Sequence, residues 1–121
     1  MDEELDLLLG TAINSLTKLE ILLYLGRRAS AVQTGEKLAA ELTRPAEATA
    51  AALEELAALG LVDRFALGTG RHVMYGAPEE ERARQILALV CERYHGNAES
   101  RSQLIRRITG APSAQDSERD D

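Results

Sequence analysis

The chain has 121 residues, of which 45% are hydrophobic and 3% are aromatic, and its formal net charge is −6. A chain of this length usually forms one domain, and with so few aromatic residues its core has to come from Leu, Ile, Val and Ala. No apolar run approaches the ~20 residues that span a bilayer, and a single cysteine excludes an internal disulfide framework.

The first elements are predicted to be helices. Residues 1–14 form an N-terminal helical extension with its leucines on one side and an interruption at Gly10. The next helix is expected to start at Thr17, because Thr17 and Glu20 have the spacing of a capping box, in which a hydroxyl and a carboxylate satisfy the first free N–H groups. This helix is expected to run to about Arg28.

Two further helices follow a short connection. Residues 29–34 are expected to connect them and to include one short strand at Val32, and Thr34 caps a helix over about 35–42. A third helix is expected over about 45–59, after the break that Pro45 imposes and before Gly60. Its expected buried residues lie three or four positions apart: Thr49, Ala52, Leu53, Leu56 and Leu59.

The spacing then changes from helical to strand-like. Residues 61–67 and 71–75 predict two strands joined by a turn at Gly68-Thr69-Gly70. Pro78 with three glutamates predicts the start of a helix that runs to about Tyr94, and a short helix is expected over 98–108. The chain thus divides into an N-terminal helical extension (1–14), a core (15–78), a C-terminal dimerisation helix with a short end segment (79–109) and a disordered acidic tail (110–121).

This order of elements resembles the winged helix-turn-helix regulators of the MarR, ArsR and PadR type. The resemblance covers about residues 15–95 and rests on LTKLEILLYL (16–25), EKLAAEL (36–42), ALEELAALGLVDR (52–64) and the hairpin to MYG (74–76). It implies a mainly α fold with a small β-hairpin wing, with additional N- and C-terminal helices. It also implies a DNA-binding transcriptional regulator whose third helix enters the major groove and whose wing contacts the flanking backbone.

Transferred by position, the outward face of the third helix consists of small and acidic residues: Ala46, Glu47, Ala48, Ala50, Ala51 and Glu54. The residues expected to contact DNA are Lys37, Arg44, Ala48, Ala51, Arg64, Arg71 and His72. An alanine offers a base edge only contact with a thymine methyl group, so this face departs from the usual polar reading helix. Two interpretations stay open: shallow insertion into DNA with basic groups on phosphates, or binding of a protein partner through the Ala/Glu face.

Apolar residues in excess of what so small a core covers predict a homodimer joined through the N-terminal segment and the helix of residues 79–94. The expected interface residues are Leu5, Leu8, Leu9, Ile86, Leu89 and Val90. A partner in the membrane is not expected, since the apolar face of the end segment is short.

Other chemistry finds little support in the sequence. Cys91 and His95 share a helix face, but zinc needs three or four ligands, so no metal site and no cofactor is expected. Four serines have no histidine at a plausible spacing: Ser15, Ser30, Ser100 and Ser102. No acidic pair is expected at the mouth of a predicted cleft, and together these observations argue against an enzyme. The acidic start, MDEELD, lacks a basic secretory leader, and the lone cysteine suits a reducing compartment, so a cytoplasmic location is expected.

Eight of the acids lie in residues 1–6 and 116–121, so the body is nearly neutral and neither requires nor excludes a phosphate-binding face.

Overall fold

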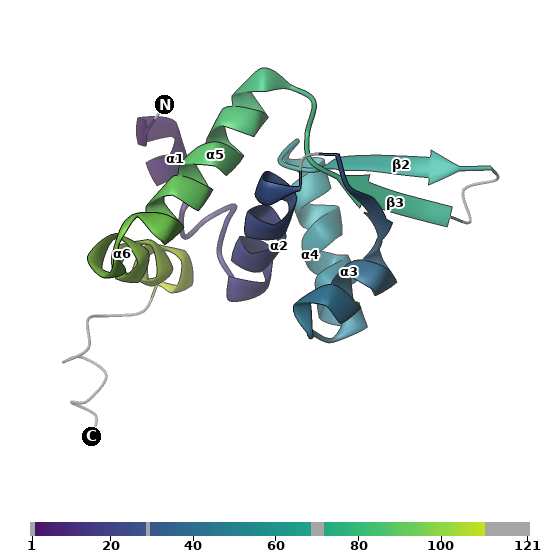
Figure 1. Cartoon of the computed structure of the whole chain (residues 1–121), viewed down its shortest axis with the longest axis horizontal. Helices are drawn as coiled ribbons and strands as arrows, with labels where there is room; N and C mark the ends of the chain where they lie inside the picture. Colours follow the sequence, from purple (N-terminus) through teal and green to yellow (C-terminus); the bar gives the residue numbers. More distant parts are fainter. Residues whose placement is uncertain (1, 29, 69–71, 111–121) are drawn as a thin grey trace.

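In the computed structural model of the protein, residues 2–28, 30–68 and 72–110 are described (Figure 1). The elements follow the predicted order: α1 (Asp2–Leu8), α2 (Leu16–Arg27), β1 (Val32–Thr34), α3 (Gly35–Leu42), α4 (Ala46–Ala58), β2 (Asp63–Leu67), β3 (His72–Gly76), α5 (Glu81–Gly96) and α6 (Ala98–Thr109). In these described parts of the chain, no helix is long and apolar enough to cross a bilayer.

The N-terminal extension ends where glycine permits a turn. Gly10 has a φ of 87°, and a Cβ there would lie 2.8 Å from the backbone oxygen of Arg107, so a side chain at this position meets both strain and a clash. The break expected at Gly10 is therefore confirmed, but the helix expected to resume and reach residue 14 ends at Leu8. Beyond the turn, Ile13 is completely buried and joins Leu5 and Leu9 in the core.

The central helix α2 begins two residues earlier than the sequence predicts. Its N-cap is Ser15, whose hydroxyl accepts a hydrogen bond from Lys18 N at 3.2 Å. The assignment of Thr17 as the cap is wrong, because Thr17 already lies within the helix. The helix packs against α4, α5 and α6, and the apolar residues from Leu19 to Leu25 are buried on almost every side of it.

The helix-turn-helix consists of α3 and α4. Thr34 caps α3 as predicted, since its Oγ1 accepts a hydrogen bond from Lys37 N at 3.1 Å. On the inner side of α4, Thr49, Ala52, Leu53 and Leu56 are all buried, as expected. Leu59 is 52% exposed, so its predicted burial is wrong: α4 ends at Ala58, and the chain turns away at Gly60, which has a φ of 79°.

The short strand expected at Val32 becomes the edge of a three-stranded antiparallel sheet with the order β1-β3-β2. The predicted hairpin is confirmed, with Arg64 opposite Tyr75 and Phe65 opposite Met74. Its first strand begins at Asp63, because Leu61 and Val62 are buried in the core ahead of it. The hairpin projects from the helices, and the tip expected to hold Arg71 lies outside the described residues (Figure 1).

Helices α1, α5 and α6 gather at the opposite end of the molecule from the hairpin (Figure 1). Asp6 of α1 accepts a hydrogen bond from Arg93 of α5 at 2.9 Å, and its carboxylate lies 3.7 Å from the guanidinium of Arg107 of α6. The expected tail lies outside the described residues from residue 111 onward.

The apolar excess inferred from the sequence is not present at four of the predicted interface positions. Leu5, Leu9, Ile86 and Val90 are between 0% and 6% exposed in the single chain, whereas Leu8 and Leu89 are partly buried. The end segment forms a full amphipathic helix, α6, whose Leu104 and Ile108 are 2% and 1% exposed and belong to the same core.

Candidate nucleic-acid interface

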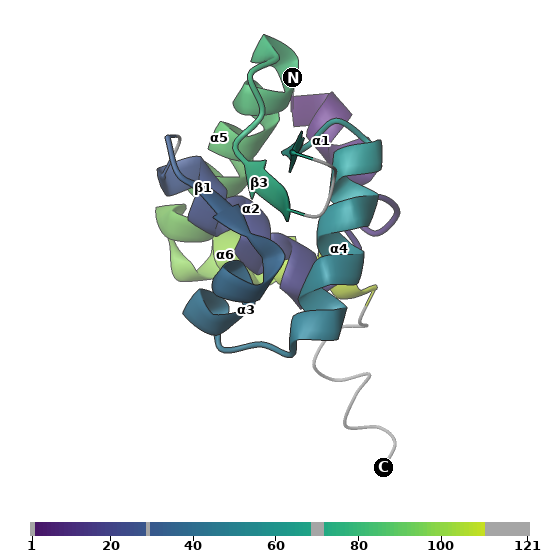
Figure 2. The same cartoon turned by 90° about the vertical axis from the view of Figure 1, so that its right-hand side faces the viewer.

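The outward face of α4 is exposed as predicted. The small and acidic residues expected there all lie on the surface: Ala46, Glu47, Ala48, Ala50, Ala51 and Glu54. Figure 2, a view along the hairpin from its tip, shows α4 beside the sheet and next to α3. Ala48 and Ala51 are exposed on α4, and Ala50 of the same face lies beside His72 and Val73 of the hairpin.

Arg44, in the turn between α3 and α4, is held by a carboxylate. Its Nε and Nη2 donate to the two carboxylate oxygens of Glu20 on α2 at 2.8 and 2.9 Å. These hydrogen bonds lower the pKa of the Glu20 carboxyl from its ordinary value, and burial opposes them only partly. Because this two-pronged pair fixes both side chains, Arg44 ties the turn to α2.

Arg64 is also paired, and through its partner the sheet is joined to α4. Glu54 of α4 accepts a hydrogen bond from Arg64 Nε at 2.9 Å and a second one, on the same oxygen, from the hydroxyl of Tyr75. The hydrogen bond from Tyr75, followed by that from Arg64, lowers the pKa of the Glu54 carboxyl. Burial, followed by the same hydrogen bond, raises the pKa of Tyr75. One carboxylate therefore links the helix to both strands of the hairpin.

A third link on α4 was not foreseen from the sequence. Lys18 of α2 is only 5% exposed, and its Nζ donates to Asn14 Oδ1 at 2.9 Å and forms an ion pair with Glu55. Nothing in the spacing of Lys18 and Glu55 along the chain signals this contact. As a result, two of the three glutamates of α4 have cationic partners, whereas Glu47 has no side-chain partner among the described residues.

Two of the predicted basic contacts are exposed and unpaired. Lys37, in the first turn of α3, and His72, at the start of β3, have no side-chain hydrogen bond or ion pair within ranges 2–28, 30–68 and 72–110. His72 and Ala50 line one hollow of about 290 Å³ together with Thr34, Gly35, Glu36, Val73 and Tyr75. Arg71 lies outside the described residues. The structure thus brings His72 next to Ala50 of the alanine face. Of the predicted basic contacts among the described residues, Lys37 and His72 are the ones without a carboxylate partner.

Cys91 lies in a packed environment that does not favour a reactive thiol. Cys91 is partly buried, with its Sγ 3.9 Å from the backbone oxygen of Leu23. Burial raises the pKa of its thiol, and the smaller effect of Arg27 opposes this. Such a shift disfavours the reactive thiolate. Within the described ranges, no three His, Cys, Asp or Glu residues are grouped so as to hold a metal ion.

Comparison with known proteins supports the fold. No family model and no curated protein matches the chain. A solved structure of a double mutant of ZitR from Lactococcus lactis is similar to it with a TM-score of 0.57 at 18% sequence identity. The match covers 85% of this chain and 66% of that chain, which is just under two thirds of its length. At this identity the likeness establishes the architecture, a mainly helical winged helix with a small antiparallel sheet.

Proposed function

We propose that the chain is a DNA-binding transcriptional regulator that acts as a homodimer, with α4 in the major groove and the β2–β3 hairpin on the flanking backbone. The observation that carries this proposal is the exposed outer face of α4 beside a projecting hairpin, which is the arrangement that winged helices use to bind DNA. The bond network of Glu54 supports it, because it holds helix and hairpin in a fixed relation before DNA arrives.

In this proposal the phosphate backbone provides most of the affinity. The alanines of α4 let its backbone approach the groove closely, while Lys37 and His72 contact phosphates. Arg44 and Arg64 are already paired with carboxylates, which weakens the attraction of each for phosphate. Since Ala48 and Ala51 offer only methyl contacts to bases, discrimination between sequences is expected to be weak. In a two-fold dimer, two copies of α4 would enter successive major grooves ~34 Å apart.

A mobility-shift titration with random duplex DNA at increasing salt tests this function. Binding is expected at low salt, with log K falling linearly as log salt rises. Lys37→Gln should reduce the magnitude of that slope by about 1. The matched control is Arg106→Gln, an exposed arginine on α6 at the other end of the molecule, which should leave the slope unchanged. The absence of any complex at low salt would remove the DNA proposal.

A second candidate is a winged-helix module that binds a protein through the Ala/Glu face without sequence-specific DNA binding. The specific observation in its favour is charge: α4 contains no lysine or arginine, Glu47 is unpaired among the described residues, and the flanking Arg44 and Arg64 are bonded to carboxylates. A photo-crosslinking residue at Ala48 separates the two candidates in cells, with the same residue at Glu99 of α6 as the control. Position-specific crosslinks to DNA favour the regulator, and crosslinks to protein alone favour the module.

A further inference from the structure

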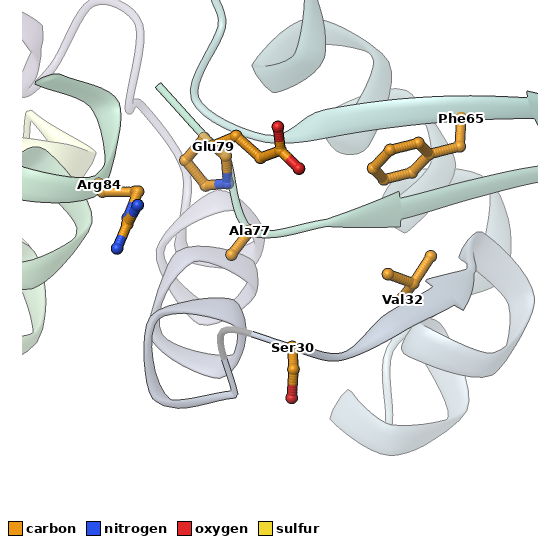
Figure 3. A pocket seen from close by; sticks show the side chains of 7 residues that line it. Ser30, Val32, Phe65, Ala77, Glu79 and Arg84 are labelled. Atoms are coloured by element: carbon orange, nitrogen blue, oxygen red, sulfur yellow. The ribbon is translucent and has the colours of Figure 1, made fainter. Parts of the chain in front are cut away.

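The outer face of the sheet, turned away from α4, contains a hollow of about 400 Å³ at the base of the hairpin (Figure 3). It lies between the sheet and the start of α5. Its lining residues come from three segments of the chain: Ser30, Val32, Phe65, Ala77, Pro78, Glu79 and Arg84. The volume falls in the range of about 300 to 1,000 Å³ in which small molecules bind.

The apolar end of the hollow is formed by Val32 and Phe65. Gly76 lies opposite both Val32 and Asp63 in the sheet, and a Cβ there would lie 3.3 Å from Val32 Cγ2 and 3.6 Å from Phe65 Cε2. Val32 and Phe65 therefore converge over the buried Gly76 from the two neighbouring strands. Val32 and Phe65 are 45% and 37% exposed, so this surface remains open to an apolar group.

The hollow also holds two opposite charges that do not neutralise each other. Arg84 comes from α5 and Glu79 from the segment before it, and both are exposed. Neither side chain has a hydrogen-bond or ion-pair partner in the described part of the chain, whereas the arginines at positions 44, 64 and 82 are paired. In Figure 3 the two groups lie on different sides of Ala77, with the Glu79 carboxylate nearer to Phe65.

We propose that this hollow binds a small zwitterion with an apolar body, of the class of the apolar α-amino acids. The ligand carboxylate pairs with the guanidinium of Arg84, its ammonium pairs with the carboxylate of Glu79, and its side chain packs on Val32 and Phe65. A simple anion would face Glu79 and a simple cation would face Arg84, so only a ligand that carries both charges matches both groups. The site is independent of DNA and goes beyond the function proposed above.

The test is a titration of the isotope-labelled full chain, followed by amide chemical shifts. The probes are L-phenylalanine and L-leucine, with three analogues that each lack one feature. N-acetylphenylalanine lacks the ammonium, phenylalaninamide lacks the carboxylate and serine lacks the apolar body. Saturable shifts confined to the residues of the hollow are expected for the two amino acids, and weaker binding is expected for each analogue.

Variants of Arg84 and Glu79 test which charged group of the ligand each side chain binds. Arg84→Gln is expected to weaken phenylalanine binding about threefold to fivefold, as for an exposed ion pair, and to leave phenylalaninamide binding unchanged. Glu79→Gln should weaken phenylalanine by the same factor and leave N-acetylphenylalanine unchanged. Arg106→Gln on α6, whose charge change equals that of Arg84→Gln, is the control and should have no effect.

Three results would each overturn the inference. The first is no saturable shift with either amino acid up to its solubility. The second is shifts centred away from the hollow, and the third is analogue or variant affinities equal to those of the parent pair. Because no DNA is present, these outcomes are separate from the success or failure of the mobility-shift experiment.

Discussion

Glu54 shows how much one residue can do at this surface. The sequence places it on the outward face of α4 as a free acid that would repel phosphate. In the structure it is bonded to Arg64 and Tyr75, and its charge is matched by the arginine. The charge of Glu20 is likewise matched, because Arg44, in the turn between α3 and α4, donates two hydrogen bonds to its carboxylate. At the residue scale, therefore, Glu20 and Glu54 hold neighbouring elements of the candidate interface together.

The lowered pKa values of Glu20 and Glu54 predict a loss of stability in acid. A group whose pKa is lower in the folded chain stabilises it above the ordinary value of 4.5, and this contribution disappears as the pH falls. Since both side chains are substantially exposed, each contributes at most about 1 kcal/mol. The urea midpoint should fall between about pH 5 and pH 3, and it should fall less in a Glu20→Gln, Glu54→Gln double variant.

The control for this experiment is Glu47→Gln. Glu47 is exposed on the same helix and has no side-chain partner among the described residues, so its variant should follow the acid profile of the parent chain. Identical acid profiles for the double variant and the parent chain would contradict the proposed role of the two ion pairs.

At the scale of elements, α2 and α5 pack closely because Gly26 has no side chain. A Cβ at this position would lie 2.7 Å from Cys91 Sγ on α5. The glycine and the cysteine are thus complementary in size, which gives Cys91 a packing role. This role needs no chemical reactivity of the thiol.

Gly26→Ala is expected to destabilise the chain by about 1 to 3 kcal/mol in urea unfolding, because the new methyl group overpacks the interface. Adding Cys91→Ala should restore much of the loss by removing the sulfur that the methyl group meets. Gly96→Ala is the matched control, since a Cβ there has only Ser100 Oγ at 4.0 Å within reach. If Gly26→Ala is as stable as the parent chain, the close packing of these helices has been misjudged.

The exposed face of α4 supports a prediction about DNA. Glu47→Lys should strengthen binding and steepen the salt dependence by about one unit of slope, because it removes a repulsion and adds a phosphate contact. Glu99→Lys on α6 makes the same charge change away from this face and serves as the control. Equal effects of the two variants in a mobility-shift assay would show that only net charge matters and that α4 does not approach the DNA.

At the scale of the whole molecule, α1 packs against other helices of the same chain. Leu5 and Leu9 enter the core, and Asp6 lies against arginines of both α5 and α6. The apolar surface left for a second copy is consequently narrower than the sequence suggests. On α1 it includes Leu7, which is 76% exposed, beside the partly buried Leu8.

If a homodimer forms through α1 and α5, Leu7→Arg should shift it toward the monomer, because an arginine replaces an apolar contact. Light scattering over a range of concentrations measures this, with twice the mass of one chain expected for the parent protein. Val32→Arg is the control, since this exposed residue lies on β1, at a distance from α1 (Figure 1). A parent chain that stays monomeric at every concentration would rule out the dimer.

Much of the fold could be predicted because it depends on short-range signals. The cap at Thr34, the break at Pro45 and the turn at Gly60 act through residues at most a few positions away, and each marks a boundary to within a residue or two. The error at Thr17 has the same origin: Ser15 offers an equivalent hydroxyl two residues earlier, and local spacing does not separate the two. Exposure of Ala48 and Ala51 followed from helical periodicity in the same way.

By itself, therefore, the sequence determined the helices, the hairpin and the alanine face, since these follow from periodicity and from the backbone preferences of Gly, Pro and hydroxyl residues. Only the tertiary structure decided which charges are paired. Glu20 and Arg44 lie 24 positions apart, and Tyr75 and Glu54 lie 21 apart, so no local pattern links them. The tertiary structure also decided that Leu5, Leu9, Ile86 and Val90, which were expected at a dimer interface, are buried within the single chain, because burial depends on what the rest of the chain packs against them.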